Sequence, residues 1–100
     1  MKLHWEPITL ELRTTFRVAH GASDVRNNVL VYLDDGVGEA AAVPYYGETQ
    51  EGIIEYLRSV PDLGDDLFDM DTVLARRPPG SRAARSAIDE ALHDLWGKRL

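Results

Sequence analysis

The sequence predicts an α+β domain in which a three-stranded antiparallel β-meander is followed by a bundle of about three helices. Residues 1–43 hold three stretches with strand patterns, separated by turn and loop residues. Residues 44–100 hold helical patterns, each with a capping or breaking residue at its ends. One hundred residues is an ordinary size for one domain, so we expect a single unit over 1–100.

Three strands are predicted in the first part. The first is marked by the apolar residues Leu3, Trp5, Ile8, Leu10 and Leu12. Their phase of two changes at Glu6-Pro7, which predicts an irregularity there, and Pro7 has no N–H, which favours a sheet edge. The run NVLVYL at 28–33 is typical of a strand covered on both faces. Turn residues at 34–36 then lead to a third strand over 37–43.

Two connections are candidates for binding, because specificity residues are often carried by loops. The first loop, residues 14–24, is too long for a tight hairpin, and the second loop, residues 44–49, follows the third strand. Together they offer aromatic rings, a cation, an imidazole and phenol hydroxyls. These candidates are Phe16, Arg17, His20, Tyr45 and Tyr46. The alternative is a local role, with Phe16 packed inward and Arg17 paired to a nearby carboxylate.

The second part of the chain predicts three helices. The first begins after Thr49 and ends near Pro61, and the second covers about 69–76 before Pro78-Pro79-Gly80. Ser81 is a suitable N-cap for the last helix, which runs without a breaker over 81–98.

The last helix carries a wide apolar arc. Its members are Ala83, Ala84, Ala87, Ile88, Ala91, Leu92, Leu95 and Trp96. At about 100° per residue they sweep roughly 220°, about twice the width that a surface helix needs. Large side chains lie on one side of this arc and alanines on the other. We therefore expect packing from two directions, with one neighbour supplied from outside this chain.

Composition excludes several classes of function. A net charge of −6 argues against non-specific nucleic-acid binding, which needs basic residues. The sequence has no cysteine, which excludes disulfides, zinc–thiolate sites and thiol catalysis. It shows neither the apolar core of a signal peptide nor a run of about 20 apolar residues. We expect a cytoplasmic protein without membrane contact.

Charged pairs on the last helix favour structural roles. Asp89 and His93 stand four apart, and a solvated charge ladder is the expected arrangement rather than a metal site. Asp94 and Lys98 have the same spacing and are expected to form an ion pair at a domain junction. No catalytic or metal-ligating residue is predicted in this chain.

Several segments resemble the N-terminal domain of the enolase superfamily. They are GVGEAA at 36–41, PYYGET at 44–49 and SRAARSAIDEALHDLWGKRL at 81–100. The likeness is to the muconate lactonizing and mandelate racemase-like enzymes, and TFRVAHG at 15–21 is most similar to dipeptide epimerases. One departure is Ala42, where relatives often have proline.

The resemblance implies that this domain caps a modified (β/α)8 barrel, which is absent here because the sequence stops at Leu100. In that family the barrel binds Mg²⁺ and abstracts the proton α to a carboxylate, while two loops of the cap close over the small-molecule substrate. No cofactor is expected in this segment. By position, Arg17 and His20 become polar contacts, and Phe16, Tyr45 and Tyr46 become walls.

Other readings remain open at this stage. The intact enzyme could instead resemble a muconate cycloisomerase or an o-succinylbenzoate synthase. A hypothesis of another class makes the chain an interaction module that binds a partner or forms a homo-oligomer through an exposed face of the helix at 81–98, including Trp96. A small-molecule binding domain built from the two loops is a further possibility.

Overall fold

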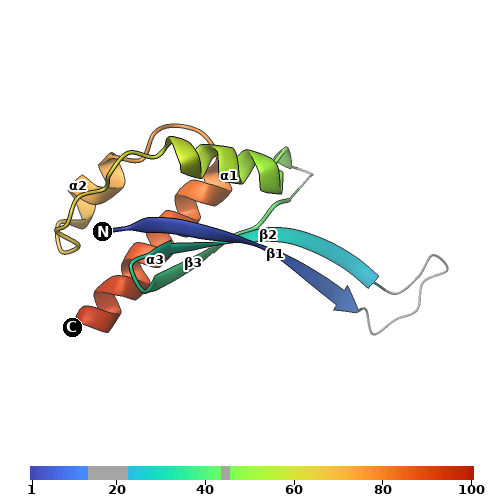
Figure 1. The fold of residues 1–100 in the computed structure, drawn as a ribbon, viewed down its shortest axis with the longest axis horizontal. Helices are drawn as coiled ribbons and strands as arrows, with labels where there is room; N and C mark the ends of the chain where they lie inside the picture. Colours follow the sequence, from blue (N-terminus) through green and yellow to red (C-terminus); the bar gives the residue numbers. More distant parts are fainter. Residues whose placement is uncertain (14–22, 44–45) are drawn as a thin grey trace.

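The computed structural model describes residues 1–13, 23–43 and 46–100 of the chain. Three strands form one antiparallel sheet in the order β1-β2-β3, and three helices follow (Figure 1). Their bounds are β1 Leu3–Arg13, β2 Ser23–Leu33, β3 Gly36–Ala40, α1 Gln50–Ser59, α2 Met70–Ala75 and α3 Arg82–Arg99. The predicted α+β meander and helical bundle are confirmed.

The pairing of β1 with β2 is continuous from Leu3 opposite Leu33 to Arg13 opposite Ser23. The prediction of an irregularity at Glu6-Pro7 is therefore wrong. Successive side chains of one strand alternate between the faces of the sheet, so the two apolar phases are its two faces rather than the two sides of a bulge. The predicted edge position of β1 is confirmed by the strand order.

Strand boundaries also differ from the expected ones. β2 begins at Ser23, so Ser23 and Asp24 are strand residues and do not belong to the first loop. β3 ends at Ala40, three positions before the expected Val43. The outcome is a long β1–β2 ladder and a short third strand.

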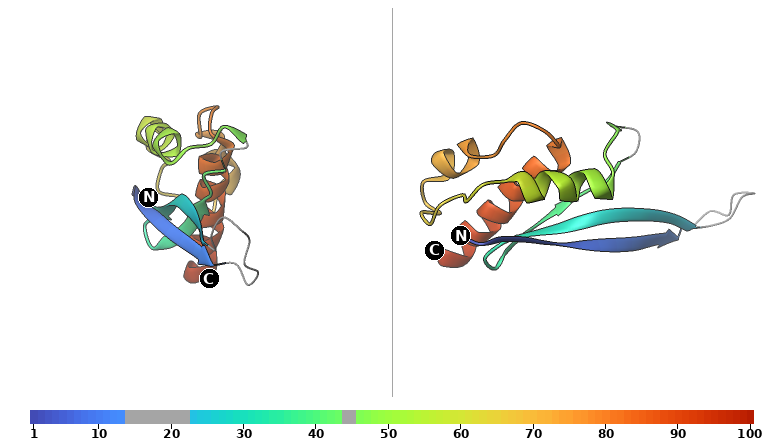
Figure 2. Two further views of the ribbon diagram at one scale, coloured as in Figure 1. Left: turned by 90° about the vertical axis from the view of Figure 1, so that its right-hand side faces the viewer. Right: turned by 45° about the horizontal axis from the view of Figure 1, so that its top comes forward.

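The helices lie on one side of the sheet (Figure 2). On that side Val29, Val31 and Leu33 of β2 are fully buried. Leu30 and Tyr32 point to the other face and are half-buried, with the Tyr32 ring stacked on His4 at a centroid distance of 4.6 Å. The prediction that β2 is covered on both faces is wrong for this chain, because all the described helices pack against one face.

A close backbone contact joins β3 to α3. A Cβ atom at Gly38 would overlap the carbonyl oxygen of Ala87, and one at Gly36 would overlap that of Ala91. The strand backbone therefore touches the helix backbone directly. The strand and the helix can approach this closely because the strand has glycines and the helix has alanines at the contact.

This contact corrects the interpretation of the alanine side of α3, which was expected to face a neighbour outside the chain. Ala84, Ala87 and Ala91 are fully buried, and so are the large residues of the same helix, Ile88 and Leu92. They share one core with residues from the sheet and from α1 and α2. The wide apolar arc is thus covered from two directions by the chain itself, because β3 occupies the alanine side.

Carboxylates of α3 satisfy the free edge of β3. Asp94 Oδ2 accepts the Val37 N–H at 2.9 Å, and Glu90 Oε2 accepts the Glu39 N–H at 3.3 Å. These two acids stand four apart and therefore lie on one face of the helix. β3 is paired with β2 on one side and with helix side chains on the other.

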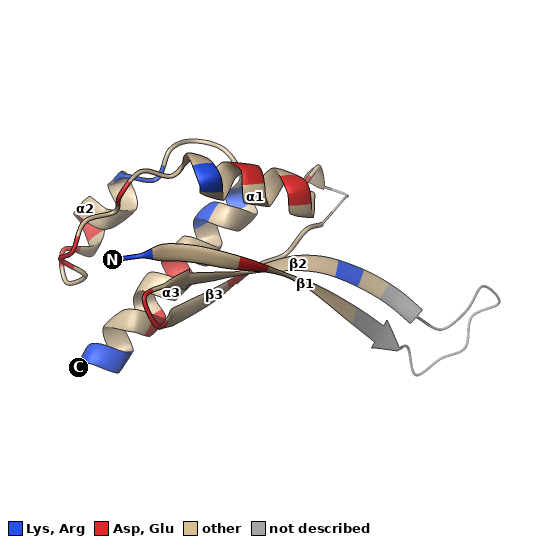
Figure 3. Ribbon diagram, in the orientation of Figure 1, with Lys and Arg blue, Asp and Glu red and all other residues tan. Residues whose placement is uncertain are grey.

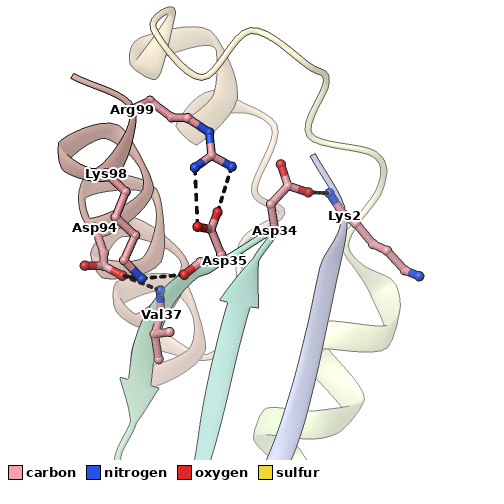
Figure 4. A network of polar contacts seen from close by, with 7 residues as sticks. All are labelled: Lys2, Asp34, Asp35, Val37, Asp94, Lys98 and Arg99. Atoms are coloured by element: carbon pink, nitrogen blue, oxygen red, sulfur yellow. Dashed lines mark hydrogen bonds and ion pairs between the residues drawn. The ribbon is translucent and has the colours of Figure 1, made fainter.

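The turn between β2 and β3 is tied to the end of α3 (Figure 4). Arg99 donates to both carboxylate oxygens of Asp35, at 2.7 and 3.3 Å, and Lys98 Nζ donates to the Asp35 carbonyl at 2.6 Å. Lys98 also lies 2.9 Å from Asp94, so the predicted ion pair is present, and the junction that it joins is internal to the domain. Asp34 Oδ1 accepts the Lys2 N–H at 2.8 Å.

Among the described helices, none is both long and apolar enough to cross a lipid bilayer.

Replacing Gly38 with alanine tests the β3–α3 contact. We expect Gly38→Ala to lower the free energy of unfolding by about 3 kcal/mol, because the new methyl group meets helix backbone that cannot rotate away. Gly97→Ala is the matched control, since a Cβ at Gly97 meets nothing within 4 Å. That control should raise stability by about 0.5–1 kcal/mol through helix propensity. Urea unfolding measures both, and equal stability of the two variants would contradict the contact.

The carboxylates of the turn network predict a dependence on pH. The hydrogen bond from Arg99 lowers the pKa of Asp35, and the hydrogen bonds from Lys98 and the Val37 N–H lower the pKa of Asp94. Because folding lowers these pKa values, their stabilising contribution is present above about pH 4 and is lost as the pH falls through the lowered values.

We therefore expect Asp94→Asn to lower the thermal midpoint at pH 7, and we expect its difference from the unsubstituted chain to shrink as the pH falls below about 4. Thermal unfolding followed by circular dichroism across this range measures the effect. Asp71→Asn, at an exposed position of α2, is the control and should leave the difference between pH 7 and pH 3 unchanged. A constant offset of Asp94→Asn at every pH would contradict the interpretation.

Candidate functional site

The structure describes one of the five predicted site residues. Tyr46 lies just before α1, and its side chain is 75% exposed. Phe16, Arg17, His20 and Tyr45 lie outside the described residues. Their assignment to a substrate site stays a prediction, and the described part of the site is the second loop and its surroundings.

The approach to the second loop is fixed by a buried asparagine on β2. Asn28 Nδ2 donates to Glu39 Oε2 at 2.7 Å, and Asn28 Oδ1 accepts the Ala42 N–H at 3.1 Å. The Asn28 carbonyl accepts from Gln50 Nε2 at 3.0 Å, which ties the first turn of α1 to the same strand. Both ends of the second loop are therefore attached to β2.

The described part of the loop forms a compact turn. The Val43 carbonyl accepts the N–H groups of Tyr46 at 3.0 Å and of Glu48 at 3.2 Å. Gly47 has a φ of 73°, in the left-handed region that favours glycine. Thr49 then caps α1 by accepting the Gly52 N–H at 3.0 Å, which confirms the predicted start of this helix.

Glu48 connects this turn to the N-terminus of α3. Its Oε2 accepts from Ser81 Oγ at 2.7 Å, and its Oε1 accepts the Ala83 N–H at 3.5 Å. Ser81 Oγ in turn accepts the Ala84 N–H at 3.1 Å, which confirms Ser81 as the N-cap. A carboxylate at this position also interacts favourably with the positive end of the helix dipole.

A hollow of about 580 Å³ lies between this loop and the first turns of α3. Its lining combines small apolar side chains, a phenol, a hydroxyl and charges of both signs. The lining residues are Ala41, Val43, Tyr46, Glu48, Arg82, Ala83 and Ser86. Such a lining suits a small polar molecule with an apolar part.

Of these lining residues only Tyr46 was predicted, and the polar ones that sequence reasoning missed are Glu48, Arg82 and Ser86. Arg82 and Ser86 stand four apart directly after the N-cap, so they share one face at the start of the helix. That spacing could have indicated a polar pair at the start of the last helix. Glu48 gave none, because the sequence does not show that the second loop and the start of α3 lie side by side.

Acidic residues gather in and before α2 (Figure 3). They are Asp62, Asp65, Asp66, Asp69 and Asp71. Three of them accept backbone N–H groups two or three residues further along, and Asp65 lies 2.8 Å from the N-terminal ammonium group. In the part of the chain that the structure describes, no group of three or more His, Asp or Glu residues could hold a metal ion.

The histidine of α3 has a local partner. His93 Nδ1 lies 2.9 Å from Asp89 Oδ1 on an exposed face of the helix. This is the i,i+4 contact expected from the spacing.

Comparisons with known proteins show that the whole chain is similar to a part of several longer enzymes. It is 36% identical to an L-Ala-D/L-Glu epimerase of Bacteroides thetaiotaomicron, a match that covers all of this chain and 28% of that enzyme. It is 29% identical to an L-Ala-D/L-amino acid epimerase of a Maribacter species, covering all of this chain and 32% of that protein. The chain thus spans about a third or less of the relatives it matches.

Two further findings concern a bacterial relative and the fold. The L-Ala-D/L-Glu epimerase of Escherichia coli is 35% identical over 88% of this chain and 28% of that enzyme. A crystal structure from Sorangium cellulosum, described as of the mandelate racemase/muconate lactonizing enzyme type, superposes with a TM-score of 0.75. It is 31% identical and covers 93% of this chain and 30% of that one. No family model matches the sequence.

The meander, the helical bundle and the loop fixed at the start of α3 define an α+β domain of the enolase N-terminal type. The chain belongs to the enolase superfamily, in the group of mandelate racemase and muconate lactonizing enzymes, and is related over its whole length to part of the dipeptide epimerases. This confirms the family indicated by the segments at 36–41, 44–49 and 81–100.

Proposed function

We propose that the chain is the capping and specificity domain of an Mg²⁺-dependent epimerase that abstracts the proton α to the carboxylate of a dipeptide. One observation carries the proposal: the whole chain matches an enzyme named L-Ala-D/L-Glu epimerase while spanning only 28% of its length. A domain that corresponds to about a quarter of an enzyme can supply part of what the activity needs, and the remaining part of the enzyme must supply the rest.

In this proposal the chain binds and selects, and the remaining part of the enzyme reacts. The described residues hold no candidate metal centre, so Mg²⁺ and the residues that transfer the proton are assigned to a barrel outside this chain. The loops contribute Arg17 and His20 as polar contacts and Phe16, Tyr45 and Tyr46 as walls. Of these residues the structure describes Tyr46, whose side chain is 75% exposed.

The competing hypotheses have less support. The interaction module required an exposed alanine ridge on the helix at 81–98, and the structure buries Ala87 and Ala91 of that ridge inside the chain. A muconate cycloisomerase or an o-succinylbenzoate synthase as the intact enzyme is favoured by none of the three relatives, which are named as epimerases.

The division of labour is tested by comparing the 100-residue chain with the full-length protein that contains it. We expect the full-length protein with Mg²⁺ to exchange the α-proton of L-Ala-L-Glu for deuterium in D2O, and EDTA to abolish this exchange. The 100-residue chain alone should produce no exchange above the uncatalysed rate. Proton NMR measures both. Exchange by the short chain, free of any other protein, would contradict the proposal, as would inactivity of the full-length protein on every dipeptide tested.

The role of the first loop is tested at Arg17. In the full-length protein we expect Arg17→Ala to raise KM for an acidic dipeptide by about 10- to 100-fold, the loss expected for a hydrogen bond to a charged group. Arg58→Ala is the control, because Arg58 lies on α1 with an exposed side chain and pairs with Glu55. An unchanged KM in Arg17→Ala would assign Arg17 to the local ion pair instead.

A further inference from the structure

We propose that Glu48 is a positioning residue that fixes the second loop on the start of α3 and so sets one wall of the substrate pocket. This inference rests on the proposed function, because it treats the second loop as part of that pocket. It adds a residue whose carboxylate is bound to the start of α3 and that acts on the pocket through the position of Tyr46.

The first step of the inference is the number of bonds to the Glu48 carboxylate. One oxygen accepts from Ser81 Oγ at 2.7 Å, and the other lies 3.5 Å from the Ala83 N–H. Glu48 is half-buried, which reduces competition from water. Hydrogen bonds to an ionised acceptor are stronger than neutral ones, so the carboxylate is a firm attachment for the loop.

The second step is the short path from Glu48 to Tyr46. Both residues donate their N–H groups to the Val43 carbonyl, and Gly47 between them takes up the left-handed backbone that closes the turn. Tyr46 therefore cannot move far while Glu48 stays bound to α3. The Tyr46 ring and the Glu48 side chain line the same hollow.

The third step is that the attachment point is itself fixed. Ser81 begins α3, and α3 rests on the glycines of β3. The position of Tyr46 relative to the sheet is thus determined without substrate. Since a preformed wall lowers the ordering cost of binding, loosening it should weaken binding and relax selection between substrates more than it slows the chemical step.

The experiment compares variants of the full-length protein on two dipeptides, L-Ala-L-Glu and L-Ala-L-Phe. We expect Glu48→Ala to raise KM for the better substrate by about 10-fold, to change kcat less than about threefold, and to narrow the ratio of kcat/KM between the two dipeptides. Glu48→Gln keeps an oxygen acceptor and should restore KM to within about threefold of the unsubstituted value.

Two controls separate positioning from general stability. Glu51→Ala removes an exposed carboxylate from the first turn of α1 and should leave KM and the ratio unchanged. Val73→Ala opens a cavity in the core at α2, away from the loop, and should lower the thermal midpoint without changing the ratio. A shift of the ratio in Val73→Ala equal to that in Glu48→Ala would overturn the inference.

The design also distinguishes the two proposals. If the unsubstituted full-length protein turns over neither dipeptide, the proposed function fails, whereas the attachment of the loop is still measured by amide hydrogen exchange at Tyr46 and Glu48. There we expect Glu48→Ala to accelerate exchange by about 10-fold or more. Turnover of both dipeptides with an unchanged ratio in Glu48→Ala would overturn the positioning role and leave the proposed function in place.

Discussion

The backbone of α3 rests on the backbone of β3, and most of the domain is organised around this contact. Gly36 and Gly38 leave no room for a side chain, so the strand lies against the alanines of the helix. The acids on the same helix then reach the outer N–H groups of the strand, and the basic residues at its end reach the turn before it. The direction of α3, set in this way, brings Ser81 to the second loop.

Local signals in the sequence were sufficient for most of the architecture. Ser81 and Thr49 predicted the starts of two helices because an N-cap needs only its own side chain and the next turn. The turn at 34–36 likewise predicted a hairpin. The sequence pattern of a helix does not reveal which element packs against it. The alanines of α3 indicated a close neighbour, and that neighbour is the glycine-containing strand β3 of the same chain.

The candidate site was less accessible to sequence reasoning for a related reason. Its loops could be found by length and composition, whereas the bond between Glu48 and Ser81 joins residues 33 positions apart. Only the folded arrangement shows that the second loop is held on α3 rather than standing away from it. The class of reaction proposed for the intact enzyme came from the resemblance to dipeptide epimerases, because no spacing in the chain indicates it.

The carboxylates that accept hydrogen bonds from β3 affect whether a strand from another molecule can add to this edge of the sheet. A sheet with open edges can grow when a strand from another chain adds to it. Here Asp94 and Glu90 already occupy the N–H groups of Val37 and Glu39, so an added strand would have to displace charged acceptors. The other edge, β1, contains Pro7, which offers no donor. In the part of the chain that the structure describes, extension of the sheet is therefore disfavoured at both edges.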